Sequence, residues 1–152
     1  MFDALRKLLS DLSPAPGARA FEPNDDRLAA AALLVHAAAI DGTISDAEQA
    51  VLRERLKTKF DLDDESVTTL IEQAIVAYRE AVDLYRFTSR LLRDLDEDGR
   101  RRIVGIMWEV VFADGQVTEF EDNLIWRAAD LLGISSHDRI ALRQRAQAAA
   151  AP

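Results

Sequence analysis

The chain has 152 residues, enough for one ordinary domain with a sizeable core. Its formal net charge of −8 argues against nonspecific nucleic-acid binding, which needs a basic surface, although a local basic patch stays open. It has no cysteine, which excludes disulfides, thiolate zinc sites and cysteine nucleophiles, and its longest apolar run, Leu28 to Ile40, is too short to span a membrane. We therefore expect a soluble cytoplasmic protein with no nucleic-acid partner and no direct membrane insertion.

The first 24 residues divide into two predicted segments. Residues 1–12 read as a short amphipathic helix, because Phe2, Leu5 and Leu9 recur at helical spacing. Residues 13–24 are rich in proline and predict a linker. The charges of the helix cancel, so we expect it to lie back on its own domain. Docking on a neighbouring copy, which would make a homodimer, is the alternative.

Residues 25–150 show helical patterns only. The sequence predicts an all-α fold, a compact bundle of seven to eight helices with two pseudo-symmetric helix-loop-helix repeats. Expected helix starts follow Asn24, Ser45, Asp63, Asp96 and Thr118, all residue types that cap helices. The predicted helices cover about 25–40, 45–60, 64–82, 84–95, 97–113, 118–132 and 136–150.

The two predicted repeats cover residues 36–52 and 109–125. In each, an apolar run ends at Asp-Gly, and a Ser or Thr then stands three residues before a Glu, the pattern of a capping box. Gly42 and Gly115 can adopt a left-handed conformation, so each Asp-Gly predicts a tight helix-loop-helix corner that needs no ligand.

Four acids of these corners are the candidate site: Asp41, Glu48, Asp114 and Glu121. Helical spacing places each of these acids at the edge of an apolar stripe of its helix. We therefore expect all four carboxylates to be partly desolvated. Helix capping is one explanation. The other is convergence of the four acids on a divalent cation or on a basic residue of a partner protein. An oxygen-only ligand set would suit Mg²⁺, Ca²⁺ or Mn²⁺.

Neither corner is an EF-hand calcium loop. Aligning Gly42 on the invariant loop glycine puts Ala37 and Ala39 at the first and third ligand positions, and the second corner has Val110 and Phe112 there. No catalytic constellation appears either: the chain has no glycine-rich phosphate loop, nucleophile elbow or pair of metal-binding histidines.

The run from Val35 to Leu52, together with 95–134, resembles the TerB-like family of tellurite-resistance-associated helical domains. The Ala-Asp-Gly element from Ala113 to Glu121 is its most specific part, whereas the first repeat has Ile40 in place of that alanine. The resemblance covers about residues 25–143. It implies a cytoplasmic, all-helical module of bacterial stress or tellurite-resistance systems, with an acidic surface for metal or protein binding, and supplies no enzymatic activity.

Two functions remain to be weighed. The first is a non-enzymatic adaptor that binds a divalent cation or a protein partner, of unknown identity, through its acidic surface. The alternative is a metal-dependent hydrolase that uses the clustered carboxylates. The Glu-x-x-His pairs that helix bundles use for such sites are absent from the sequence, which favours the adaptor.

Overall fold

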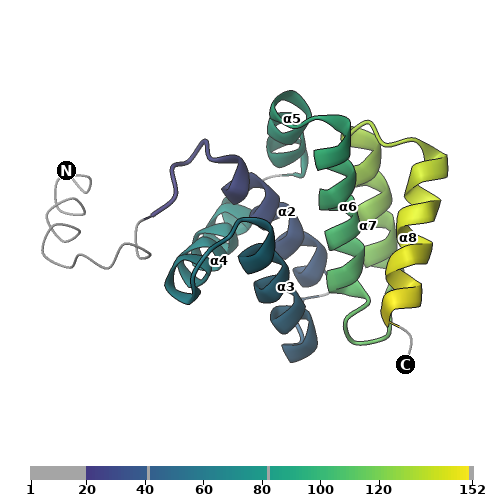
Figure 1. Ribbon diagram of the computed structural model, residues 1–152, viewed down its shortest axis with the longest axis horizontal. Helices are drawn as coiled ribbons and strands as arrows, with labels where there is room; N and C mark the ends of the chain where they lie inside the picture. Colours follow the sequence, from purple (N-terminus) through teal and green to yellow (C-terminus); the bar gives the residue numbers. More distant parts are fainter. Residues whose placement is uncertain (1–19, 41, 82, 151–152) are drawn as a thin grey trace, which may run out of the picture.

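The computed structural model describes residues 20–40, 42–81 and 83–150, and within them it contains helices and no strand (Figure 1). The predicted all-α bundle is therefore confirmed. The predicted N-terminal helix and most of the predicted linker lie outside the described residues. The helices are α2 (Asp26–Ala39), α3 (Asp46–Lys59), α4 (Asp64–Glu80), α5 (Tyr85–Asp94), α6 (Glu97–Val111), α7 (Glu119–Leu131) and α8 (Ser136–Ala150).

Side-chain caps start most of these helices where the sequence predicts them. Ser45, Asp63, Asp96 and Thr118 each accept a hydrogen bond from the backbone N–H three residues on. The first helix differs, because Asp25 and not Asn24 is its cap. The carboxylate of Asp25 accepts from the Arg27 backbone N–H at 2.9 Å and also pairs with the Arg27 guanidinium, so two interactions fix the start one residue later.

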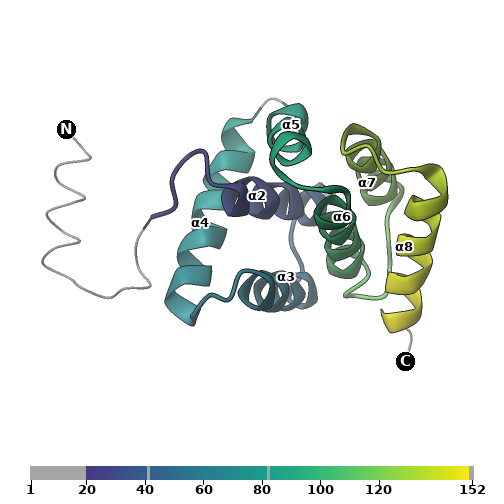
Figure 2. The same cartoon turned by 45° about the horizontal axis from the view of Figure 1, so that its top comes forward.

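Helix α2 forms the centre of the bundle. It contacts α3, α4, α5, α6 and α7, and Figure 2 shows it surrounded by these neighbours. Leu33 and Leu34 are fully buried, and most of the remaining buried residues of α2 are alanines. Short side chains let neighbouring helices approach closely, which explains how one helix packs against so many others.

Helix α8 packs on α6 at the side of the bundle away from α4 (Figures 1 and 2). Trp108 of α6 is buried, and the Arg143 guanidinium from α8 lies over its ring at 5.2 Å and over that of Phe112 at 5.4 Å. Arg143 also pairs with Asp122 of α7 at 3.1 Å. This cation–π and ionic contact ties α8 to both α6 and α7.

The described end of the predicted linker is attached to the bundle. Phe21 is buried, and its backbone exchanges two hydrogen bonds with the Gln73 side chain, at 2.7 Å and 3.0 Å. In the described part of the chain, no helix combines the length and apolar character needed to cross a membrane.

Candidate functional site: the paired corners

Both predicted Asp-Gly elements form tight corners between helices. Gly42 has a φ of 106° and Gly115 a φ of 83°, values in the left-handed region that favours glycine. The N–H of each glycine donates to a carbonyl three residues back, Ala39 in the first corner and Phe112 in the second, both at 2.9 Å. The corners therefore agree in local structure, while the pseudo-symmetry of the whole hairpins stays a prediction.

A reciprocal capping box follows each corner, as predicted. In α3, the Ser45 hydroxyl accepts from the Glu48 N–H and the Glu48 Oε1 accepts from the Ser45 N–H, both at 3.1 Å. In α7, the equivalent bonds join Thr118 and Glu121 at 3.1 Å and 2.9 Å. Each glutamate side chain is thus bent back over its own helix start, with one carboxylate oxygen engaged.

The fold brings these two glutamates together. Glu48 and Glu121 are each only 2% exposed, and their side chains are within hydrogen-bonding reach of each other. Two carboxylates repel when both are ionised, so a hydrogen bond between them requires that one carries a proton. Among the described residues, no N–H or hydroxyl group donates to the Glu48 Oε2, and the Glu121 side chain is the acidic group that interacts with Glu48.

This environment shifts the pKa of Glu121. Burial raises the pKa of this carboxyl group, and the hydrogen bond and the charge of Glu48 raise it further. The hydrogen bonds with Thr118 lower it, and the resulting pKa is about 7. The expected desolvation of these two acids is therefore confirmed. Near neutral pH, Glu121 is therefore at the boundary between its protonated and its ionised form.

The other two predicted acids fare differently. Asp114 was expected to continue the apolar stripe of α6 and to be partly desolvated, and this is wrong. Helix α6 ends at Val111, so Asp114 lies in the turn beyond it, is exposed, and accepts a hydrogen bond from the Gln116 N–H at 3.1 Å. Asp41 lies outside the described residues. Over the described ranges, no group of three or more His, Asp or Glu side chains is placed to hold a metal ion.

A second acidic contact was not predicted from the sequence. Asp26, in the first turn of α2, has a raised pKa, caused first by burial and then by a hydrogen bond to Asp94 at the end of α5. Asp94 also pairs with Arg93 at 3.0 Å. The sequence carries no local signal for this contact, because the two residues belong to different helices and match no common motif.

Fold and site together define a small, acidic, all-α domain in which two helix-capping glutamates meet in the interior. The chain belongs to the TerB family: the family model described as "Tellurite resistance protein TerB" matches residues 27–144, from α2 into α8. The resemblance found in the sequence is thereby confirmed. Neither the curated proteins nor the solved structures contain a match to the chain.

Proposed function

We propose that this chain is a non-enzymatic binding module of the tellurite-resistance type, and that its Glu48–Glu121 pair exchanges a shared proton for a divalent cation. The observation that carries the proposal is the buried Glu48 Oε2, which has no N–H or hydroxyl donor among the described residues. A buried carboxylate oxygen needs a proton, a hydrogen-bond donor or a cation. The neighbouring Glu121, with its pKa of about 7, makes the proton easy to displace at neutral pH.

The chemistry of the donors suits a hard cation. The Oε1 atoms of both glutamates are held by the capping boxes, so the Oε2 atoms are the ones free to bind. Mg²⁺, Ca²⁺ and Mn²⁺ prefer carboxylate, carbonyl and water oxygens. Asp41 and Asp114 remain the candidates for completing the ligand set, and Asp114 would first have to leave its hydrogen bond to Gln116.

The surface beside the pair is suited to a protein partner. Phe120, in the first turn of α7, is 67% exposed, its chain neighbour Glu119 is an exposed acid, and Asp114 in the preceding turn is a second one. An exposed aromatic ring on an acidic helix start would complement a partner that offers an apolar pocket with basic residues around it. Because Glu121 follows Phe120 directly, a change at the carboxyl pair acts on the helix start that presents this ring.

The alternative of a metal-dependent hydrolase gains no support. Such a site needs several metal ligands and a group that activates water or substrate. The Glu-x-x-His pairs that helix bundles use for such sites are absent from the sequence.

The proposal is tested by thermal unfolding in EDTA and then in millimolar Mg²⁺, Ca²⁺ or Mn²⁺ at about pH 7.5. A cation present at about 100 times its Kd stabilises the folded state by about 2.7 kcal/mol, which corresponds to a rise in Tm on the order of 10 °C. We expect this rise for the wild-type chain and for Glu119→Gln, which removes an exposed carboxylate from the same helix turn.

The variants Glu48→Gln and Glu121→Gln keep the capping hydrogen bond, because the amide oxygen still accepts it, but a neutral amide is a poor cation ligand. They should therefore lose the shift. A wild-type Tm that no cation moves, or an equal shift in Glu48→Gln, would remove the cation from the proposal.

A further inference from the structure

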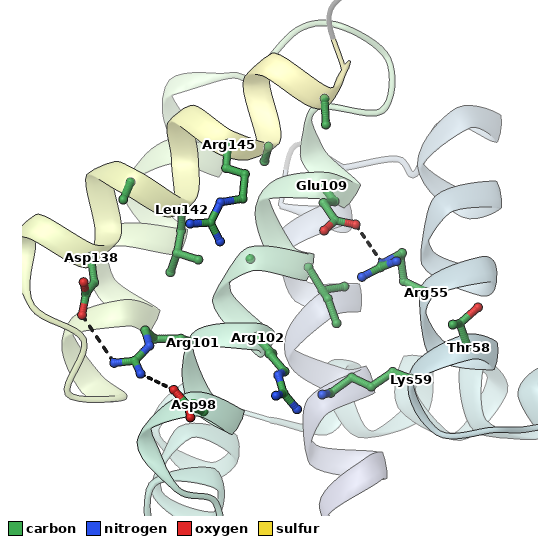
Figure 3. Close-up of a pocket in the computed structure, with 15 residues that line it drawn as sticks. Arg55, Thr58, Lys59, Asp98, Arg101, Arg102, Glu109, Asp138, Leu142 and Arg145 are labelled. Carbon is green, nitrogen blue, oxygen red and sulfur yellow. Dashed lines mark hydrogen bonds and ion pairs between the residues drawn. The ribbon is translucent and has the colours of Figure 1, made fainter.

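A groove runs across the face of the bundle where α6 lies between α3 and α8. The cavity has a volume of about 890 Å³, with α6 as its floor and the two other helices as its walls (Figure 3). Its lining on α6 extends from Asp98 to Glu109. At 1.5 Å per residue, this corresponds to a groove about 16 Å long, the length of three helical turns.

The acidic side chains of the groove all take part in ion pairs. Glu109 of α6 forms an ion pair with Arg55 of α3 at 2.8 Å. Asp98 and Asp138 both pair with Arg101, the second at 3.5 Å. Arg101 also pairs with Glu97, so its single charge is shared among several carboxylates, but the lining still holds five basic side chains against three acidic ones.

Three basic side chains of the groove remain without a counter-ion. Lys59 of α3, Arg102 of α6 and Arg145 of α8 form no ion pair with any described residue, and all three line the cavity. In Figure 3, the Lys59 and Arg102 side chains point toward each other. The pKa of Lys59 is lowered by burial, then by the charges of Arg102 and Arg55. In a chain with a net charge of −8, this is a local excess of positive charge facing a groove.

The groove also offers apolar surface between these charges. Ala141 and Leu142 of α8 are partly exposed, Ala149 is exposed, and Gly105 contributes no side chain to the floor. A floor of short and aliphatic side chains lets another chain segment lie close to α6.

We propose that this groove binds an acidic, amphipathic helical segment of a partner protein. The carboxylates of that segment would face Lys59 and Arg102 on one side and Arg145 on the other, and its apolar side would cover Leu142 and Ala149. A cation pair where the α3 wall meets the floor, with a further cation on the α8 wall, matches charges spread along a segment, which a single small anion would not provide. The inference rests on the proposed role as a binding module, but uses none of the residues of the carboxyl pair.

The test is fluorescence anisotropy with a labelled helical peptide of about 16 residues, carrying glutamates on one face and leucines on the other. We expect saturable binding at about 50 mM NaCl that weakens strongly at about 500 mM, because ionic contacts are screened. The double substitution Lys59→Gln with Arg102→Gln should weaken binding at least about tenfold. The matched control, Arg79→Gln with Arg86→Gln, changes the net charge equally on exposed parts of α4 and α5 and should bind as the wild type does.

Three results would overturn the inference. The first is equal peptide affinity of the groove variant and the control variant, and the second is equal binding of a peptide with lysines in place of the glutamates. The third is displacement of the peptide by ATP or inorganic phosphate, which would make the groove a site for small anions. Circular dichroism of each variant establishes that it is folded. The pair of substitutions Glu48→Gln and Glu121→Gln should leave peptide binding unchanged, so failure of the groove and failure of the cation site give different results.

Discussion

Replacing Glu121 by Gln should change how the stability of the domain depends on pH. Glutamine copies the protonated form of Glu121: its amide oxygen can still accept from the Thr118 N–H, and its NH₂ group can donate to Glu48. Unlike the carboxyl group, it never ionises. The variant therefore keeps the geometry of the pair and removes its titration.

The size of the effect follows from the pKa of Glu121, which rises from 4.5, its ordinary value, to about 7 in the folded chain. Between these values, the folded state holds a proton that the unfolded state has released, so the free energy of unfolding falls as the pH rises through this window. One pKa unit corresponds to about 1.4 kcal/mol, which makes the loss by pH 8 about 3 kcal/mol. The stability supplied by the protonated pair is complete below about pH 4.5.

The assay is urea unfolding at intervals from pH 5 to pH 8, in the presence of EDTA, for the wild type, Glu121→Gln and the control Glu119→Gln. At pH 5 we expect all three to have similar stability. At pH 8 the Glu121→Gln variant should exceed the wild type by up to about 3 kcal/mol, with Glu119→Gln following the wild type. The titrating groups outside positions 119 and 121 are common to all three chains, so the difference between Glu121→Gln and the wild type isolates the pair. A Glu121→Gln profile parallel to that of the wild type would refute the shared proton.

Three further substitutions test the corners and the groove floor by urea unfolding. Thr118→Ala removes the hydroxyl that caps α7 and should cost about 1 kcal/mol, most clearly at pH 5 where the pair is protonated. Gly115→Ala should cost about 1 kcal/mol, because alanine is strained at the φ of 83° found there. An added Cβ would meet no atom within 4 Å, so steric overlap should contribute nothing, and an unchanged stability would mean that the corner relaxes. Gly105→Ala, in the interior of α6, should stabilise the chain by about 0.5–1 kcal/mol, since its Cβ would make an ordinary 3.6 Å contact with Leu142. A loss of stability there would show that the contact is too tight.

The sequence predicts those features that depend on near neighbours along the chain. The capping boxes of Ser45 and Thr118 and the glycine corners appear as expected, because a cap needs only a hydroxyl and a backbone N–H three residues away. The start of α2 at Asp25 shows the limit of this reasoning. Asn24 and Asp25 are both good caps, and the additional ion pair with Arg27 decides between them.

The candidate site was harder to predict because it depends on how helices pack. Repetition of the acids suggested that they converge, but only the tertiary structure brings Glu48 against Glu121 and leaves Asp114 exposed. The exposure of Asp114 follows from the end of α6 three residues earlier, and periodicity alone does not locate such an end. The groove could not be predicted at all, because Lys59, Arg102 and Arg145 come from three different helices.

The alanines of α2 determine where a domain of this shape can accommodate change. Any larger side chain at Ala31 or Ala32, both fully buried, would force neighbouring helices apart, a substitution that typically costs about 1–3 kcal/mol. Substitutions in the middle of the bundle should therefore be tolerated less often than substitutions in its outer helices and turns. Relatives that diverge in what they recognise should accordingly keep this methyl-lined axis and differ at the periphery.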